Sequence, residues 1–474
     1  MSMEFPAAAA RDRSSGDSRF VLLLAALAGA VIAQIAIALV FGSMAGSARD
    51  SWIVSMPLFV LLASSGGFVL WTVWHARALA FSPRVWMAIV LAGLLMRLPY
   101  FGTGPMLEDD HFRYLLDGAM VANGFSPYAL SPQDLLNGSH GASAGLVAAG
   151  RQVIEAINFP DLRSVYPGTA QLLFAIAHAV MPWDVDGIRL IVLCAEGITA
   201  LLVWHVLKIS GRPAHGVMLY WCNPLMAFSL TGQGHIDAAL VPAVFVALLA
   251  GWYGRSLVAG MALGMAVGVK LWPILLAPLL ARVLWPNRQA LVVFALGLAI
   301  TSAILCAPLV LASLSPHAGL AAYAGGWSVN NAPFAWLSYG ALHLIGPTTG
   351  EQALRLTLAA LGISLSLLVA LKRPEDPGRL FGSAALLAAS VFYLSPAQFP
   401  WYAVWFLPLA LAGGRWALAA ATIGLPVYFL FFPLAAEGQR DIHTYGLAAL
   451  HVMPVLMVSV LVHRSSRQGG VSWV

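Results

Sequence analysis

The chain has few charged residues for its length. Only 9% of its 474 residues are Asp, Glu, Lys or Arg, whereas 60% are hydrophobic and the mean hydropathy is +0.82. This composition excludes an ordinary soluble domain. Because apolar runs close to the length of a bilayer crossing recur throughout, we predict an all-α polytopic integral membrane protein.

Cysteine is also scarce. Cys194, Cys222 and Cys306 lie inside apolar segments without paired spacing, which excludes a disulfide framework or a thiolate metal site. The formal charge of +5 does not indicate nucleic-acid binding, because the basic residues are scattered singly at the ends of apolar runs. The polar N-terminal residues lead into an apolar run that is too long for a signal-peptide core, so we expect a retained first helix.

The scattered basic residues predict the orientation of the chain. Arginines precede the first apolar run, and His75, Arg77 and Arg84 separate the second from the third, which places these ends in the cytoplasm. We expect cytoplasmic tails at residues 1–19 and 465–474 around a single transmembrane domain at 20–464, with a long first outer loop at 101–186 that carries interfacial helices. No internal repeat is visible.

The expected crossings number about 12 to 14, depending on two short segments. Ala170 to Met181 is read as interfacial, because a crossing there would carry the next basic residues outward. Ser256 to Leu284 is read as a hairpin of two short helices with Lys270 at its tip, facing a cavity. The other expected spans are Phe20 to Phe41, Trp52 to Trp74, Arg84 to Tyr100, Ile188 to Leu207, His215 to Leu230, Ile236 to Tyr253, Ala290 to Ser313, Leu354 to Leu371, Leu380 to Leu394, Tyr402 to Ala412, Trp416 to Leu434 and Tyr445 to His463.

The rare acidic residues gather in one stretch of the outer loop. Glu108, Asp109 and Asp110 are consecutive and stand where a helical segment begins, a position that favours negative charge. One acid can cap the helix, but three exceed what a cap needs, so chemistry is favoured for Asp109 and Asp110. Arg113 and Asp117, four residues apart, are expected to form an ordinary helical ion pair.

Other polar residues fall on the same predicted side of the membrane. Ionisable groups at a membrane edge are candidates for function, because burying a charge is costly unless it is paired. Each also has a structural alternative, such as anchoring a helix for Arg189 or capping one for Asp237. The remaining candidates are His235, Lys270, Asn330, Asn331 and Gln398.

Four aromatic residues stand near the outer ends of the late segments. Tyr402 and Trp405 are interpreted as part of an aromatic belt at the membrane surface. Trp327 and Trp401 lie beside polar loops, so these two are kept as candidates for a sugar-binding platform.

The acidic stretch resembles the first outer loop of GT-C glycosyltransferases that use polyprenyl-phosphate sugars, above all the bacterial polyprenol-phosphate-mannose-dependent mannosyltransferases. Asp110 precedes Tyr114 by four residues, Asp117-Gly118 follows, and Ser126-Pro127-Tyr128 closes the pattern. The resemblance continues in order through VYPGTAQ, the arginine of GIRLIVL, GHID, GVKLWP and SPAQFPWY, and so covers nearly the whole chain. It departs from the family at Tyr166-Pro167-Gly168 and at His235-Ile236-Asp237.

The resemblance implies an enzyme in the bacterial inner membrane with its site facing the periplasm. It would move a hexose, with mannose as the sugar that the resemblance implies, from a polyprenyl-phosphate donor to a hydroxyl of a lipid-linked or cell-envelope glycan, with inversion. Asp110 would be the general base, with Asp109 as a neighbour that tunes or replaces it. The residues expected to bind substrate are Arg189, His235, Asp237, Lys270, Tyr114, Tyr166, Trp327, Asn331, Gln398 and Trp401.

The expected partners are the lipid-linked donor, the glycan acceptor and membrane lipid, without nucleic acid. The sequence requires no cofactor and no metal, although a divalent ion at Asp109 and Asp110 stays open. Two alternatives are a flippase or transporter for lipid-linked glycans, and an O-antigen-type polymerase or ligase. A transporter should show a repeat and charges near the bilayer midplane, and a polymerase usually has its large outer loop late in the chain.

Overall fold

The computed structural model describes residues 7–42, 50–76, 81–138, 144–314 and 318–467. All regular elements in these ranges are helices, and the ranges contain no strand, only an isolated parallel bridge between Val329 and Ala397. Residues 1–6 and 468–474 of the expected tails, and Arg77, lie outside the described residues. The predicted all-α polytopic fold is confirmed.

Eight helical segments of the described chain are long and apolar enough to cross a membrane, or up to nine if one bent pair counts as a single span. The predicted number of 12 to 14 is therefore not confirmed. Several expected crossings are short or broken, such as α3 (Pro83–Arg97) and the pair Ala214–Gly232 and Ile236–Trp252, which is bent by 109°. The long helices include α1 (Ala7–Ala36), α2 (Trp52–Ala76), α8 (Val185–Ile209), α14 (Arg288–Ala312), α17 (Pro347–Ala370) and α18 (Pro377–Leu394). The last span, Ile442–Arg464, contains most of α22 (Met453–Arg467).

The outer helices expose apolar side chains where a soluble protein would carry charge. Ile304 on α14 is 70% exposed, and Ile32 on α1 and Leu367 on α17 are also exposed. Exposed aliphatic faces of this length match the acyl chains of a bilayer. The bundle is thus apolar both inside and outside, and polar groups within it need partners from the protein itself.

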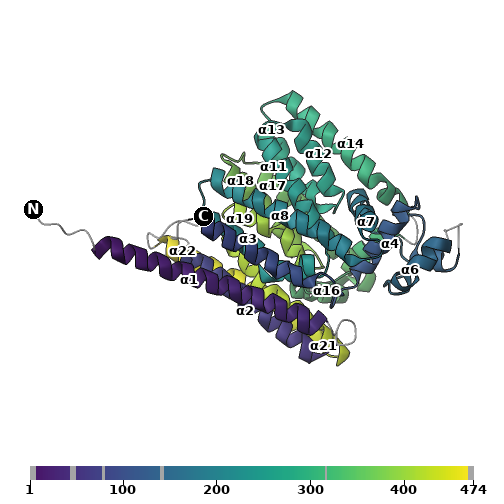
Figure 1. The fold of residues 1–474 in the computed structure, drawn as a ribbon. Coiled ribbons are helices and arrows are strands. Elements are labelled where there is room, and N and C mark those ends of the chain that lie inside the picture. The colour runs from purple at the N-terminus through teal and green to yellow at the C-terminus, as the bar shows by residue number, and fades with distance from the viewer. Residues whose placement is uncertain (1–6, 43–49, 77–80, 139–143, 315–317, 468–474) are drawn as a thin grey trace, which may run out of the picture.

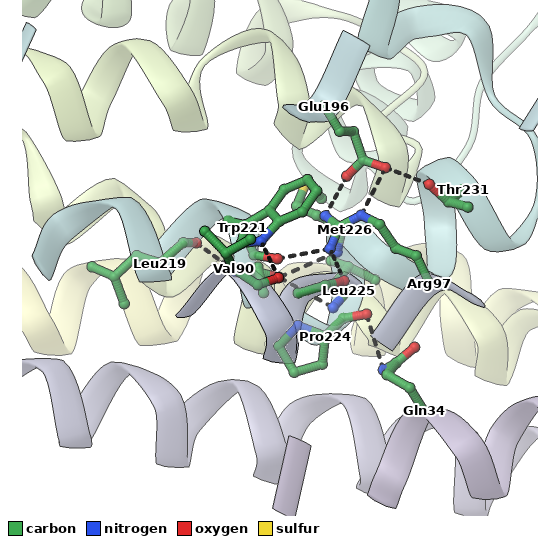
Figure 2. A network of polar contacts seen from close by, with 12 residues as sticks. Gln34, Val90, Arg97, Glu196, Leu219, Trp221, Pro224, Leu225, Met226 and Thr231 are labelled. Atoms are coloured by element: carbon green, nitrogen blue, oxygen red, sulfur yellow. Dashed lines mark hydrogen bonds and ion pairs between the residues drawn. The ribbon is translucent and has the colours of Figure 1, made fainter. Parts of the chain in front are cut away.

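A buried ion pair stabilises one of the broken helices (Figure 2). The chain breaks between α9 (Met218–Trp221) and α10 (Pro224–Met226), which leaves backbone carbonyls without helical partners. Arg97 donates to the Trp221 carbonyl at 2.7 Å and is paired with Glu196, and neither side chain of the pair is exposed. Irregular backbone at membrane depth is tolerated only when its polar groups are satisfied in this way.

The short helices α4 (Asp110–Ala122), α6 (Ala144–Glu155) and α7 (Gly168–Val180) lie at the end of the molecule opposite to the start of α1 (Figure 1). Gly118 lets α4 approach α7, because a Cβ atom there would lie 2.3 Å from the Phe174 carbonyl oxygen. With 13 residues, α7 is too short to cross a bilayer, as predicted for this segment.

The hairpin predicted around Lys270 is confirmed. Helix α12 (Ser256–Val267) ends three residues before Lys270, and the chain returns through the 3-10 turn η7 (Trp272–Leu276) and α13 (Ala277–Leu284). The sequence did not predict α15 (Gly319–Gly326) or α16 (Ala332–Ile345), which occupy the region between α14 and α17.

Candidate functional site

A cavity of about 520 Å³ opens among the start of α4, the loop before α7, the tip of the hairpin and the turn η8 (Pro400–Trp405). Five of the residues predicted for the site line it: Asp109, Asp110, Tyr166, Lys270 and Trp327. Parts of the chain as far apart in sequence as Glu108 and Phe432 thus meet around one cavity.

The acidic residues begin α4 at the wall of this cavity. Asp109 takes the N-cap position, but its side chain makes no capping hydrogen bond; its carboxylate accepts one from the Asn158 side chain. Asp110 is the first residue of the helix, and 43% of its side-chain area is accessible. Since Asp110 also lines the cavity, its carboxylate is available to a bound molecule.

The Asp110 carboxyl has a raised pKa. Burial within the confined site, followed by repulsion from Asp109, raises the pKa of Asp110 to about 6, against the opposing attraction of Lys270. The accessible area of Asp110 opens into the cavity, so the confined space and the neighbouring charges act together on it. A carboxylate with a pKa close to neutral accepts a proton more readily than an ordinary surface aspartate.

Lys270 supplies the positive charge of the cavity. Its Nζ lies 3.0 Å from Asp237 Oδ1 and 4.4 Å from the centre of the Tyr402 ring. Asp237 is 1% exposed, and the same Oδ1 atom accepts a hydrogen bond of 2.9 Å from Trp405 Nε1. Asp237 therefore orients Lys270 from behind, while 22% of the lysine side chain stays accessible.

His235 and Trp401 lie behind Asp110 and do not line the cavity. Their rings stack at 3.7 Å with an angle of 11° between the planes, and both side chains are buried. His235 Nδ1 lies 3.9 Å from Asp110 Oδ2, and neither ring nitrogen has a hydrogen-bond partner among the described residues. The histidine thus lies directly behind Asp110.

Arg189 does not reach the cavity. It is fully buried and donates to the carbonyls of Thr231 and Gly232, at 3.2 Å and 2.7 Å, and to Asp186 at 2.8 Å. These carbonyls precede the bend that leads to His235 and Asp237. Arg189 thus holds the backbone of the site.

Asn331 and Gln398 join two loops beside the cavity. The Asn331 side chain caps α16 and donates to the Ser395 carbonyl at 2.6 Å. The backbone N–H of Gln398 donates to the Val329 carbonyl at 2.9 Å. The Gln398 side-chain amide donates to the backbone carbonyl of Tyr393 at 3.0 Å. Both residues fasten the loop of Trp327 to the turn η8.

Tyr114 of α4 packs against Tyr166 of the loop before α7. Tyr114 is 1% exposed, with its ring centre 5.1 Å from that of Tyr166 and 4.6 Å from that of Phe174. The expected ion pair between Arg113 and Asp117 is not formed. Asp117 is buried and accepts hydrogen bonds from Ser164 and Gln171 instead, which tie α4 to α7.

The sequence missed two residues that surround Lys270. Tyr402 and Trp405 were interpreted as part of a membrane-surface belt, and this interpretation is wrong because they are 3% and 5% exposed and pack around the lysine. Their spacing of three residues, on one side of a helical turn, was the available signal. Phe159 and Tyr323, which also line the cavity, carry no such signal in the sequence.

Metal ligands do not converge here. Within the described ranges no three His, Cys, Asp or Glu side chains are grouped closely enough to hold an ion. Asp109 and Asp110 offer two carboxylates, and independence from metal stays a prediction.

Comparison with known proteins gives a consistent family. The model of the family "Alpha-(1->6)-mannopyranosyltransferase, N-terminal domain" matches residues 18–286, more than half of the chain. Alpha-(1->6)-mannopyranosyltransferase A of Mycobacterium tuberculosis is 28% identical over 395 residues, covering 77% of this chain and 72% of that protein. The protein of the same name from Corynebacterium glutamicum is 28% identical over 184 residues, covering 37% of this chain and 34% of its own. No solved structure matches the chain.

Proposed function

The chain belongs to the alpha-(1->6)-mannopyranosyltransferase family, and from the geometry of its cavity we propose that it transfers mannose from a polyprenyl-phosphate donor to a glycan hydroxyl. One observation carries this proposal: a carboxylate with a raised pKa, Asp110, and an oriented cation, Lys270, line the same cavity. That pair matches the two charges that develop during glycosyl transfer, a proton leaving the acceptor and an anion leaving the donor.

Lys270 is placed to hold the donor phosphate. Its partner Asp237 is buried and keeps one oxygen on the ammonium group, while the accessible part of the lysine faces the cavity. An ammonium group fixed in this way needs little reorganisation as negative charge grows on the leaving phosphate. His235 is buried behind Asp110, with Nδ1 3.9 Å from Asp110 Oδ2, so it would act on the substrate only through that carboxylate.

A path for the donor's lipid tail is offered by a groove whose first residue, Ile274, follows Lys270 by four positions. An apolar groove of about 580 Å³ runs between α13 and α14, starting at Ile274 on η7 and ending at Trp285. Eleven residues of helix correspond to roughly 16 Å of length. The groove is lined by Ile274, Ala277, Pro278, Ala281, Trp285, Leu291, Phe294, Ala295, Leu298, Ala299 and Ser302. Its small residues leave room for an isoprenoid chain, which would otherwise stay in the bilayer.

The reaction balances with these groups. The acceptor oxygen forms a bond to the anomeric carbon of mannose and loses its proton to Asp110. The bond between that carbon and the phosphate oxygen breaks, and the polyprenyl phosphate leaves as an anion beside Lys270. Asp109 tunes Asp110 or replaces it.

A single displacement inverts the anomeric carbon. The relatives are named alpha-(1->6)-mannopyranosyltransferase A, which implies an α-linked product at a 6-hydroxyl, so transfer by one inversion requires a β-linked donor. A chain that accepts only the β-anomer of a polyprenyl-phosphate mannose would support this mechanism, whereas equal use of the α-anomer would contradict it.

We further propose that the cavity faces the periplasm of a bacterial inner membrane. The support is the distribution of basic residues along the sequence and the position of α4 at the end of the molecule opposite to the start of α1. The acceptor would then be a lipid-linked or envelope glycan.

The decisive experiment uses the purified chain in nanodiscs with β-linked polyprenyl-phosphate mannose and an α-mannoside acceptor. We expect release of polyprenyl phosphate coupled to the product, and Asp110→Asn should lower kcat by about 10²- to 10⁴-fold. Asp109→Asn is the matched control and should retain most of the activity. Wild-type rates in a folded Asp110→Asn variant would exclude Asp110 as the base. Movement of lipid-linked glycan across the membrane without release of polyprenyl phosphate would instead support a transporter.

A further inference from the structure

Phe159 combines two properties that packing does not explain. Its backbone has φ of +53°, and among the described residues only Trp183 and Asn330 share a positive φ without being glycine. This conformation is strained for a bulky residue and persists only where its surroundings hold it. Yet the Phe159 side chain is 58% exposed, so burial of the ring does not compensate the strain.

The strained residue is tied to the acidic wall of the cavity. Its carbonyl accepts hydrogen bonds from Leu162 N at 3.0 Å and from Arg113 Nη2 at 3.4 Å. The preceding residue, Asn158, donates from its side chain to Asp109. The position of the Phe159 ring is therefore fixed relative to Asp109 and, through it, to Asp110.

The ring of Trp327 packs against that of Phe159 at the cavity. The two ring centres are 4.9 Å apart, with 60° between the planes. Arg355 holds the Trp327 carbonyl with two hydrogen bonds of 3.2 Å. The Trp327 ring lies 5.5 Å from that of Tyr323, whose hydroxyl is 2.8 Å from that of Tyr402, the ring beneath Lys270.

The two aromatic rings thus connect the side of the cavity that carries Asp109 and Asp110 with the side that carries Lys270. A pyranose ring has polar edges and an apolar C–H face, and such a face packs against aromatic rings while its hydroxyls reach polar groups beside them. Asn158, Arg113 and Arg163 line the cavity next to Phe159 and offer those polar groups. An isoprenoid tail would not need this polarity, and the apolar groove along α13 already serves it.

We propose that Phe159 and Trp327, whose rings touch, form one aromatic platform for the acceptor glycan, which binds the sugar that receives mannose or the sugar next to it. This inference rests on the proposed transfer reaction and names its acceptor side: an α-mannoside chain that packs a C–H face on the exposed part of these two rings. The left-handed backbone conformation of Phe159 turns its ring toward Trp327. The strained conformation would thus be kept because it positions a ring that binds the glycan.

The test measures glycan binding and turnover separately. Binding of an alkyl α-(1→6)-mannotrioside to the full chain in detergent, without donor, is followed by saturation-transfer NMR and calorimetry. Phe159→Ala and Trp327→Ala should weaken binding and raise the acceptor KM by about tenfold each, with the donor KM unchanged. Phe159→Trp, which keeps a ring, should stay within about threefold of wild type.

Two further variants separate the ring from the strain. Phe159→Gly relieves the positive φ and removes the ring, so it should raise the melting temperature but lose glycan binding as Phe159→Ala does. Phe68→Ala removes another exposed aromatic residue, which stacks on Trp71 of α2 and does not line the cavity, and should change nothing.

The results distinguish the aromatic platform from the reaction. Equal glycan binding by wild type and Phe159→Gly would overturn the platform even if mannose transfer is confirmed. A raised donor KM in Phe159→Ala with unchanged acceptor binding would assign the rings to the donor and also overturn it. Binding of the mannotrioside that depends on both rings would support the platform even if the transferred sugar proves not to be mannose.

Discussion

The pH dependence of transfer gives the sharpest test of Asp110 as the base. Because the pKa of Asp110 is raised to about 6, kcat/KM should fall as pH drops through that value and the carboxylate becomes protonated. Asp109 raises this pKa by repulsion, second only to burial. Removal of the Asp109 charge should therefore move the acidic limb to lower pH.

The size of the shift follows from Coulomb's law. Two charges roughly 6 Å apart interact by about 0.7 kcal/mol in bulk water and by about 3 kcal/mol at an effective dielectric constant of 20. Since 43% of the Asp110 side chain is accessible, solvent screening favours the lower end of this range. We expect Asp109→Asn to lower the apparent pKa by about half a unit to one unit, at about 1.4 kcal/mol per unit.

The assay is kcat/KM for the donor between pH 4.5 and 8, scaled to the plateau of each variant. At pH 5, Asp109→Asn should retain about three to five times more of its plateau than wild type, as expected for that shift. Lys270→Met should move the limb the opposite way, because Lys270 lowers the pKa of Asp110. Glu375→Gln, with an exposed charge at the start of α18, is the control and should not move it.

If the acidic limb of the pH profile does not move in Asp109→Asn, the reasoning is refuted. It is also refuted if Lys270→Met moves this limb to lower pH. Since Asp109 and Asp110 are adjacent, the measured value belongs to the pair, and the direction of each shift carries the argument.

Three further predictions concern stability and the donor. Arg97→Met leaves Glu196 buried without its cation and should destabilise the fold by about 3 kcal/mol or more, seen as a lower melting temperature by tryptophan fluorescence, while Arg97→Met/Glu196→Met should recover part of the loss. Gly118→Ala should cost about 1–3 kcal/mol, because its Cβ would collide with the Phe174 carbonyl and separate α4 from α7; a wild-type melting temperature would contradict that packing. Ala281→Phe should raise the KM for long-chain donors and leave short-chain donors unaffected, and equal effects on both would exclude the groove as the path of the tail.

Hydropathy and order along the chain determined a large part of this protein. Long apolar runs have no solution in a membrane except helices, so the fold class follows from composition. The hairpin at Lys270 follows from two apolar halves that are too short to cross. The adjacent acids at a helix start, with Tyr114 one turn later, indicated Asp110 before any contact was known.

Tertiary structure alone decided which polar residues share the cavity. Arg189 and Lys270 are similar in sequence, each a lone cation at the end of an apolar segment, yet Arg189 satisfies backbone carbonyls and Lys270 lines the site. Tyr402 and Trp405 have the composition of a membrane belt but pack around that lysine. The physical reason is that lipid and protein interior are equally apolar, so hydropathy shows which segments avoid water but not which neighbour satisfies a buried polar group.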